Sequence, residues 1–306
     1  VSISDTADKA NLIYLLKYDT IYGQLDAEIE DSETGIVVNG KEIVFNTWKN
    51  GDDAKWDKLN TDVVVLATGK PKTKEDVEKH LSKGCKKVIV ASTPEDFKDI
   101  QIYVPGANDE DINLNSSAFS LGSNTANAVA PILKALESKV GVERAFLTTV
   151  HGYSNSNRLA DVAGEGFRLN RAAGENIIPN ITKSSEVIAN VLPFIEGKIA
   201  SSSMTVPIPD GSTVDLTIDI KNESSIEDIN RIIENASKSE LKNIIGLTYD
   251  PIVSSDVVRS TLSGLVDGLA TMVIKNKKIK LIIWFDNGWG YAARIVDTVK
   301  KLGQVF

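Results

Sequence analysis

Few side chains in this sequence are of the types that most often carry acid–base or nucleophilic chemistry. The 306 residues include two histidines and one cysteine. His151 stands where an apolar stretch, residues 146–150, meets a long polar stretch, residues 152–176, and an imidazole titrates close to neutral pH. His80 ends a charged helical stretch, so we expect it to be a surface residue. Cys85 precedes an apolar stretch, and we interpret it as a structural thiol.

Composition excludes several functional classes. The net charge is −8, with 42% hydrophobic and 25% charged residues, which is typical of a folded globular protein. We expect no nucleic-acid or membrane partner, because non-specific binding to either needs a basic face and no apolar run reaches the roughly 20 residues of a membrane span. One cysteine excludes a disulfide within the chain and fits a cytoplasmic localisation. The length predicts two domains, and we assign no residue to a metal.

The elements that must position these side chains change character near residue 120. Before it, apolar strands alternate with helices, and such short connections predict right-handed crossovers in a doubly wound, Rossmann-type α/β sheet. Asn39-Gly40 separates two β-branched runs and predicts a hairpin with a primed turn. The expected strands cover residues 1–3, 36–38, 43–45, 63–67 and 88–90, and the expected helices cover residues 10–17 and 73–81.

After residue 120 the pattern predicts an α+β domain. Strands with alternating polar and apolar residues indicate a mixed, largely antiparallel sheet that is covered on one face. The expected elements are helices over residues 123–138 and 292–302 and strands over residues 146–150, 214–220 and 279–285. The polar stretch at residues 152–176 is too long for an ordinary connection, so we expect it to be functional or to form an interface.

Four motifs occur in order along the chain. They are Leu15-Leu-Lys-Tyr-Asp-Thr-Ile-Tyr-Gly23, Thr148-Thr-Val-His-Gly-Tyr153, Asn176-Ile-Ile-Pro179 and Trp284-Phe-Asp-Asn-Gly-Trp-Gly-Tyr291. Together they resemble the bacterial and eukaryotic type of glyceraldehyde-3-phosphate dehydrogenase, over essentially the whole chain. The resemblance implies an NAD-binding domain at residues 1–122, with a C-terminal helix at residues 291–306 packing back on it, and a catalytic and dimerisation domain at residues 123–290. It also implies a homotetramer, and oxidation of an aldehyde through a cysteine thioester that phosphate cleaves.

The nucleophile position departs from the family. Where the family has Ser-Cys-Thr-Thr-Asn-Cys, this chain has Ser123-Asn-Thr-Ala-Asn-Ala128, so Asn124 stands in place of the cysteine. An amide has no accessible anion and cannot form the thioester. His151 matches the family's general base and should lie within reach of residue 124. The alternative, which we favour, is an imidazole without a task that is hydrogen-bonded to Asn124.

The phosphate sites also depart from the family. An arginine in an Arg-Val-Pro sequence is replaced by Thr205, so a bidentate cation is lost. Lys183 replaces a glycine and either supplies a new charge for an anion or is simply solvated. Ser123 should point towards the phosphate pocket. The residues that the resemblance assigns to substrate or phosphate are Ser123, Thr125, Ser154, Ser156 and Thr182.

The residues that match the family's NAD-binding positions are partly retained. Asp5 matches the acid that binds the ribose hydroxyls, which favours NAD over NADP, but it could equally be a helix N-cap. Thr68 and Gly69 match a strand-end pair that approaches the cofactor. Asn287 matches the partner of the nicotinamide carboxamide, and Tyr291 matches a nearby tyrosine.

The chain contains no Gly-x-Gly-x-x-Gly sequence, the loop that carries the pyrophosphate in dinucleotide-binding domains. The first strand of a doubly wound sheet is central, and it too is absent from the sequence. We therefore expect unpaired edges at the strands of residues 1–3 and 63–67. The segment should lie upstream of Val1 or be supplied by another chain, and NAD is the expected cofactor only if that segment exists.

Three functions stay open at this point. The first is a degenerate family member, a pseudoenzyme with a structural, regulatory or ligand-sensing role, which forms a homo-oligomer or joins a paralogue and takes a small phosphorylated ligand. The second is an NAD-dependent oxidoreductase that acts on a phosphorylated aldehyde with altered chemistry. The third is an assembly protein that uses residues 152–176 as an interface. We expect Trp289 and Tyr291 to be buried near the subunit core.

Overall fold

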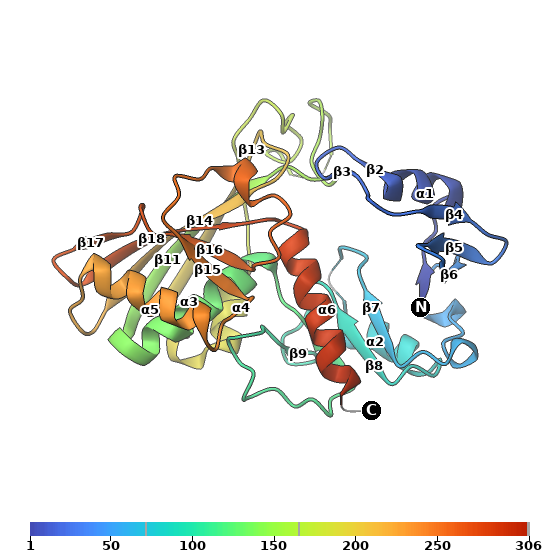
Figure 1. The fold of residues 1–306 in the computed structure, drawn as a ribbon, viewed down its shortest axis with the longest axis horizontal. Coiled ribbons are helices and arrows are strands. Elements are labelled where there is room, and N and C mark those ends of the chain that lie inside the picture. The colour runs from blue at the N-terminus through green and yellow to red at the C-terminus, as the bar shows by residue number, and fades with distance from the viewer. Residues whose placement is uncertain (71, 165, 305–306) are drawn as a thin grey trace. The chain divides into compact units, whose positions relative to one another are not determined.

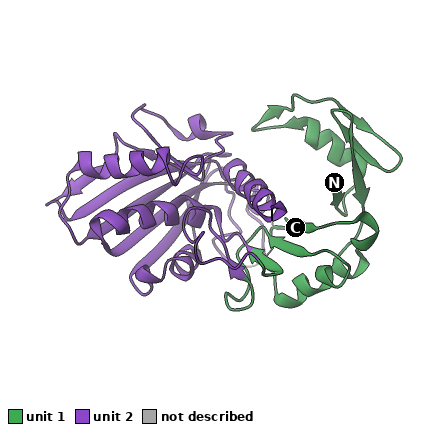
Figure 2. Ribbon diagram, turned by 60° about the horizontal axis from the view of Figure 1, so that its bottom comes forward, with its two compact units in different colours: residues 1–100, 115–119 green, residues 101–114, 120–306 purple. Residues whose placement is uncertain are grey.

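The computed structural model describes residues 1–70, 72–164 and 166–304. The chain divides into two compact units, which Figure 2 shows in separate colours. Unit 1 comprises residues 1–100 and 115–119, and unit 2 comprises residues 101–114 and 120–306. The division at residue 122 and the return of the C-terminal helix onto the first domain stay predictions.

The first sheet of unit 1 has the strand order β1-β6-β5-β4. Its strands are β1 (Ser2–Ser4), β4 (Ile29–Asp31), β5 (Gly35–Val38) and β6 (Lys41–Asn46). The hairpin predicted from Asn39-Gly40 is confirmed, since Val38 pairs with Lys41 and both turn residues have positive φ, 50° and 74°. Helix α1 (Lys9–Lys17) packs Ile13 against this sheet, and the short strands β2 (Tyr18–Asp19) and β3 (Gly23–Gln24) follow it.

A second four-stranded sheet, of order β7-β8-β10-β9, begins in unit 1 with a strand–helix–strand crossover. Strands β7 (Val63–Leu66) and β8 (Lys87–Val90) are parallel, and α2 (Lys74–Leu81) connects them. The Thr73 hydroxyl accepts from Asp76 N while the Asp76 carboxylate accepts from Thr73 N, so the two residues cap the start of α2 reciprocally. The sheet continues through β10 (Ala118–Ser120), and β9 (Gln101–Ile102) is followed by Tyr103, whose N–H donates to Ser120 O at 2.8 Å.

Both sheets end at strands that we expected to have unpaired edges. Within the described ranges, β1 lies at the end of its sheet and pairs with β6. In the same way, β7 lies at the end of its sheet and pairs with β8. The described strands of this part of the chain therefore form two separate four-stranded sheets.

His80 is not the surface residue that the sequence predicts. The Trp56 indole donates from Nε1 to His80 Nδ1 at 3.1 Å, and Gly51 lies against the other side of the ring. Burial is the main cause of the lowered pKa of His80. The prediction was wrong because a helix-end position does not show that the segment at residues 51–59, with the 3₁₀ helices η1 (Gly51–Asp53) and η2 (Asp57–Leu59), packs on it.

Unit 2 is built on an eight-stranded mixed sheet. Seven strands follow the order β12-β13-β11-β14-β18-β16-β15, and β17 pairs with β18. The strands are β11 (Val142–Gly152), β12 (Ile178–Asn180), β13 (Ile199–Val206), β14 (Ser212–Ile220), β15 (Ile245–Thr248), β16 (Gly264–Asp267), β17 (Met272–Ile274) and β18 (Lys278–Phe285). β11 runs parallel to β13 and antiparallel to β14. The mixed, largely antiparallel sheet is thus confirmed.

Helices cover one face of this sheet, as Figure 1 shows for α3 and α5. The helices are α3 (Asn124–Val140), α4 (Ser184–Val191), α5 (Ile226–Lys238) and α6 (Trp289–Gly303), with the 3₁₀ helices η3 (Pro193–Ile195) and η4 (Ser254–Val257). The alternation in β14 places Val214 and Leu216 in the core and leaves Thr213 and Asp215 half-buried on the other face. No helix within the described residues has the length and apolar character needed to cross a membrane.

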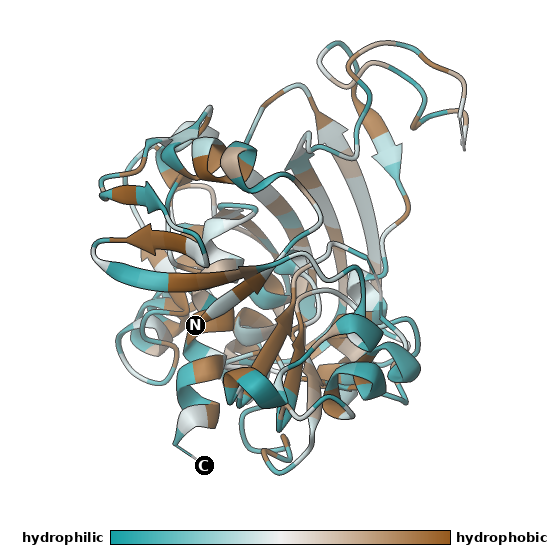
Figure 3. Ribbon diagram, turned by 90° about the vertical axis from the view of Figure 1, so that its right-hand side faces the viewer, coloured by the Kyte–Doolittle hydropathy of each residue, from teal (hydrophilic) through white to brown (hydrophobic). Residues whose placement is uncertain are grey.

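The long segment between β11 and β12 has a single bridge, Arg158 with Ala172, among its described residues. Figure 3 shows it projecting from the strands, with apolar and polar residues mixed along it. Leu159 and Phe167 are 94% and 96% exposed. Trp289, at the start of α6, is exposed at 38% rather than buried as expected, and Tyr291 is half-buried.

Candidate functional site

His151 lies at the end of β11, where its ring is held on two sides. Nδ1 is 2.9 Å from Ser212 Oγ, and Nε2 is 3.5 Å from Thr125 Oγ1. The edge of Phe285 meets the ring at a centroid distance of 5.9 Å. Burial lowers the pKa of His151, while the side-chain amide of Asn287 opposes that shift. The imidazole is therefore neutral at pH 7 and could accept a proton.

Ser212 and Asn287 link His151 to the loop before α6. The Ser212 hydroxyl, which is fully buried, donates to Asn287 Oδ1. β14 begins at Ser212, and its register with β11 pairs Thr213 with Val150, so Ser212 arrives beside His151. Ser212 is not among the site residues predicted from the sequence. The sequence indicates only that Ser212 stands at the start of a strand. The pairing of β11 with β14 is needed to show that this position lies beside His151.

Asn124 is the first residue of α3, and both polar atoms of its side chain are engaged. Its Nδ2 donates to the backbone oxygen of Asn287 at 3.2 Å, and its Oδ1 accepts from Thr125 N at 2.8 Å. The expected hydrogen bond between His151 and Asn124 is not among these contacts, so that prediction was wrong. The amide instead joins α3 to the loop that precedes α6.

Ser123 caps α3 rather than pointing towards a phosphate pocket. Its Oγ accepts from Ala126 N at 3.1 Å, which is the usual task of a serine at this position. Thr125 is 1% exposed, and its hydroxyl accepts from Thr149 Oγ1 at 3.5 Å. Thr125 therefore lies between Thr149 and His151.

The other hydroxyl residues assigned to phosphate bond to nearby polar groups. Ser154 and Ser156 bond to each other at 2.9 Å, and Thr182 bonds to Ser184 at 2.8 Å at the start of α4. Thr205 is buried on β13 and accepts from Asn180 Nδ2 at 2.6 Å. A neutral, buried threonine with this partner carries no charge for an anion.

The residues expected at the nucleotide fall in both units. In unit 1, Asp5 Oδ1 accepts from Ala7 N at 2.9 Å, while Asp8 caps α1 by accepting from Asn11 N. The helix-cap alternative for Asp5 is therefore wrong. Thr68 and Gly69 follow β7 and are exposed.

In unit 2, the Tyr291 hydroxyl donates to the backbone oxygen of Gly122 at 3.0 Å. Burial raises the pKa of this phenol, so it remains a hydrogen-bond donor throughout the working range of pH. The bond attaches the first turn of α6 to the residue before Ser123, which caps α3.

Two buried carboxyl groups beside Asn287 were not found from the sequence. Asp286 is 1% exposed and accepts from the N–H groups of Gly288 and Trp289. Asp210 is 5% exposed and accepts from Asn287 N at 3.1 Å. Burial is the main cause that raises the pKa of Asp210, and the nearby charge of Asp286 raises it further. Backbone hydrogen bonds oppose this shift, but the pKa remains above its usual value.

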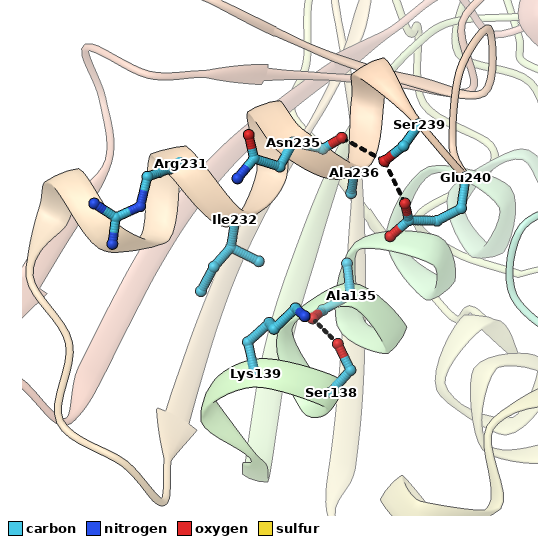
Figure 4. Close-up of a pocket in the computed structure, with 9 residues that line it drawn as sticks. All are labelled: Ala135, Ser138, Lys139, Arg231, Ile232, Asn235, Ala236, Ser239 and Glu240. Carbon is cyan, nitrogen blue, oxygen red and sulfur yellow. Dashed lines mark hydrogen bonds between the residues drawn. The ribbon is translucent and has the colours of Figure 1, made fainter.

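A separate hollow of about 400 Å³ lies between α3 and α5. Figure 4 shows that Lys139 and Arg231 reach its rim from different helices and that Ile232 and Ala135 form its apolar part. None of the residues that line it belongs to the set predicted from the sequence. It is therefore not the site built around His151.

A Rossmann-type unit followed by a unit with a mixed sheet, in which a strand-end histidine lies beside the start of a helix, is an architecture that two-domain, nucleotide-dependent dehydrogenases have. Residues 1–74 match the family "Glyceraldehyde 3-phosphate dehydrogenase, NAD binding domain", and residues 123–287 match "Glyceraldehyde 3-phosphate dehydrogenase, C-terminal domain". The chain belongs to the glyceraldehyde-3-phosphate dehydrogenase family.

Curated relatives agree with this assignment. The chain is 39% identical to glyceraldehyde-3-phosphate dehydrogenase of Geobacillus stearothermophilus over 298 residues, which cover 97% of this chain and 88% of the relative. It is 40% identical to that of Borreliella burgdorferi over 309 residues, covering 99% and 92%. It is 38% identical to glyceraldehyde-3-phosphate dehydrogenase 1 of Bacillus subtilis over 305 residues, covering 99% and 90%. We predicted NAD as a cofactor only if a further segment exists. Because the NAD-binding family matches residues 1–74, this condition is not supported.

Proposed function

We propose that this chain is a member of the glyceraldehyde-3-phosphate dehydrogenase family that lacks the phosphorylating dehydrogenase activity. The observation that carries the proposal is Asn124 at the first position of α3. Its amide nitrogen donates to Asn287 O, and its oxygen accepts from Thr125 N. An amide nitrogen has no lone pair free to attack a carbonyl, so no acyl intermediate can form at this position.

No other thiol takes over this task. Cys85 belongs to unit 1, is 6% exposed, and burial raises its pKa to about 11. A thiol with that pKa is almost wholly protonated at pH 7 and is a poor nucleophile. The Ser123 hydroxyl is occupied as the cap of α3.

A second departure supports the same proposal independently. Thr205 stands where the family resemblance places an arginine, and it is buried against Asn180. Without a guanidinium, the site lacks the bidentate contact that holds a phosphate most firmly. Two changes of different kind thus remove the covalent step and weaken binding of the anion.

The test is a direct assay of the full chain. Glyceraldehyde 3-phosphate, inorganic phosphate and NAD are expected to give no NADH above the rate without protein, and mass spectrometry is expected to find no acyl adduct. A relative from Bacillus subtilis serves as the positive control. NADH formation at a rate of about 1 s⁻¹ or more, or an adduct on any residue, contradicts the proposal.

The role left for such a protein is to sense or bind a ligand. Within unit 1, Asp5, Thr68 and Gly69 are the residues we propose for NAD. Titration calorimetry of the full chain with NAD checks this role, with Asp5→Ala as the variant that should weaken binding. Heat of binding that is the same with Asp5→Ala would remove Asp5 from the proposed site.

A second function is favoured by the neutral protonation state of His151. A neutral imidazole beside the start of α3 can take a proton from the hydroxyl of an aldehyde hydrate. A bound nicotinamide would supply the hydride acceptor that oxidation of the hydrate to a carboxylic acid needs. This chemistry needs no thiol and no phosphate. An NADH signal from a phosphorylated aldehyde without inorganic phosphate, lost in His151→Gln, would establish it in place of the first function.

We also propose that the protein is an oligomer, either of identical chains or with a paralogue. Leu159, Phe167 and Ile181 are almost fully exposed in or just after the segment between β11 and β12, and Phe146 is 61% exposed on the face of the sheet opposite α3. Burial of such exposed apolar side chains against another chain would remove apolar surface from water. The buried, reduced cysteine fits the cytoplasm, where we place the protein.

A further inference from the structure

The two ring nitrogens of His151 have partners with different hydrogen-bonding capacity. The hydroxyl proton of Ser212 points to Asn287 Oδ1, and Ser212 Oγ also lies 2.9 Å from His151 Nδ1. A hydroxyl has one proton, and a carbonyl oxygen only accepts. Because the Ser212 proton is directed at Asn287, the hydrogen bond with His151 must use a proton carried by Nδ1.

The hydrogen bonds on the other side of the ring run in the same donor-to-acceptor direction. Thr149 Oγ1 donates to Thr125 Oγ1, and Thr125 Oγ1 faces His151 Nε2, each pair at 3.5 Å. A threonine that accepts from Thr149 keeps its own proton for Nε2. The donors thus follow one direction, from Thr149 through Thr125, His151 and Ser212 to Asn287.

We propose that Ser212 is a positioning residue that holds neutral His151 with its proton on Nδ1, so that the lone pair of Nε2 faces Thr125 and the first turn of α3. Thr125, Thr149 and Ser212 are each 1% exposed or less, so water has little access to replace a missing partner. Phe285 closes the ring edge from β18. A ligand at Nε2 must then offer an O–H or N–H donor, as an alcohol or an aldehyde hydrate does, rather than a carbonyl oxygen.

His80 supplies an internal reference of the opposite kind. The indole Nε1–H of Trp56 only donates, so the Nδ1 of His80 accepts and its proton lies on Nε2. The chain has just these two histidines. One sample of the full chain therefore contains both tautomers, each fixed by a named neighbour.

The test is a long-range ¹H–¹⁵N correlation spectrum of the full chain with ¹⁵N-labelled histidine at pH 8, where both rings are neutral. His80→Gln assigns the two sets of signals. The expected result is a protonated Nδ1 in His151 and a protonated Nε2 in His80. A protonated Nε2 in His151, which would follow if Asn287 were turned to donate to Ser212, overturns the proposal.

Variants separate positioning by Ser212 from a general effect of burial. Ser212→Ala is expected to move the tautomer ratio of His151 about two- to tenfold towards Nε2–H, the change that fits loss of one buried hydrogen bond. Ser212→Thr keeps the hydroxyl and is expected to restore the ratio. Trp56→Phe is the matched control, which should shift His80 and leave His151 unchanged.

The proposal can be tested whether or not Ser212→Ala folds. If Ser212→Ala folds and the ratio of His151 stays the same, Ser212 does not position the ring. If it does not fold, the spectrum of the unaltered chain still decides the tautomer. Asn287→Asp then tests the direction of the chain of donors, because a carboxylate can only accept and should keep the proton on Nδ1 while raising the pKa of His151.

Discussion

At the scale of single residues, the ring of His151 is held by neutral hydroxyl groups rather than by charged side chains. Thr125 and Ser212 face the two nitrogens of His151 with hydroxyl groups that donate or accept but carry no charge, and the neutral amide of Asn124 bonds to Asn287. Burial lowers the pKa of His151, so the ring stays neutral as well. The arrangement favours binding of an uncharged, hydroxyl-bearing group over formation of an anion.

Restoring a thiol at residue 124 should restore nucleophilicity. In Asn124→Cys the new side chain lies at the first residue of α3, next to Thr125, which faces His151. A helix N-terminus with a nearby imidazole lowers a thiol pKa. Alkylation by iodoacetamide at pH 7 is expected to be at least about tenfold faster than that of Cys85. The unaltered chain, in which only Cys85 reacts, is the control. Equal rates would show that the start of α3 does not activate a thiol.

The buried carboxyl pair predicts a stability that depends on pH. The pKa of Asp210 is raised, so the folded state holds its proton more tightly than the unfolded state, and the stability linked to it is lost as pH rises through the folded pKa. Asp210→Asn keeps an acceptor for Asn287 N and cannot ionise. We expect it to stabilise the fold at pH 8 by about 1–2 kcal/mol, with a smaller gain at pH 4.

Urea unfolding at both pH values checks this expectation. Asp215→Asn is the control, because that carboxyl lies half-exposed on the open face of the sheet and pairs with Lys280 at 2.6 Å. A gain of the same size at both pH values would mean that the Asp210 proton is not involved.

At the scale of elements, the pairing of β11, β14 and β18 brings the site together. The register places Ser212 opposite Phe285 and Thr213 opposite Val150. The turn that leads into β14 depends on Gly211, whose φ of +84° suits glycine. A Cβ at this residue would lie 2.0 Å from Ser254 O, so no side chain fits there.

Gly211→Ala should therefore disturb the turn on which Asp210 and Ser212 both depend. The positive φ and the contact with Ser254 together are expected to cost at least about 2 kcal/mol in the free energy of unfolding. Gly174→Ala is the matched control, since no heavy atom lies within 4 Å of a Cβ there and φ is not positive. Chemical denaturation of the two variants compares them, and equal stability would contradict the role of Gly211.

At the scale of the whole molecule, unit 1 contains the four-stranded sheet β1-β6-β5-β4, the pair β2-β3 and the parallel strands β7 and β8, and unit 2 is built on one eight-stranded sheet. The segment between β11 and β12 extends from unit 2 with exposed Leu159 and Phe167. Such side chains are costly to leave in water, and burial against a second chain would remove that cost.

Charge placed on this segment should disrupt the proposed oligomer. Leu159→Asp together with Phe167→Asp is expected to shift the sedimentation coefficient towards that of a single chain, because unpaired carboxylates are costly to bury in an interface. Leu269→Asp, at a residue 60% exposed outside the segment, is the control and should leave the coefficient unchanged. A single-chain coefficient for the unaltered protein would overturn the proposal of an oligomer.

The sequence by itself determined the features that depend on short range. Asn39-Gly40 fixed the hairpin between β5 and β6 because its two residues tolerate positive φ, and Thr73 with Asp76 fixed the start of α2 through reciprocal caps. The four motifs gave the family, and Asn124 and Thr205 gave the departures from it, because residue identity at a matched position needs no coordinates.

Only the tertiary structure decided which side chains meet. Asn124 bonds to Asn287 rather than to His151, Trp56 covers His80, and Ser212 lies beside His151. These contacts join residues 24 to 163 positions apart in the chain, so no local pattern encodes them. Hydrogen bonds are directional and of short range, and their partners follow from strand register and packing, which the sequence sets only through the fold as a whole.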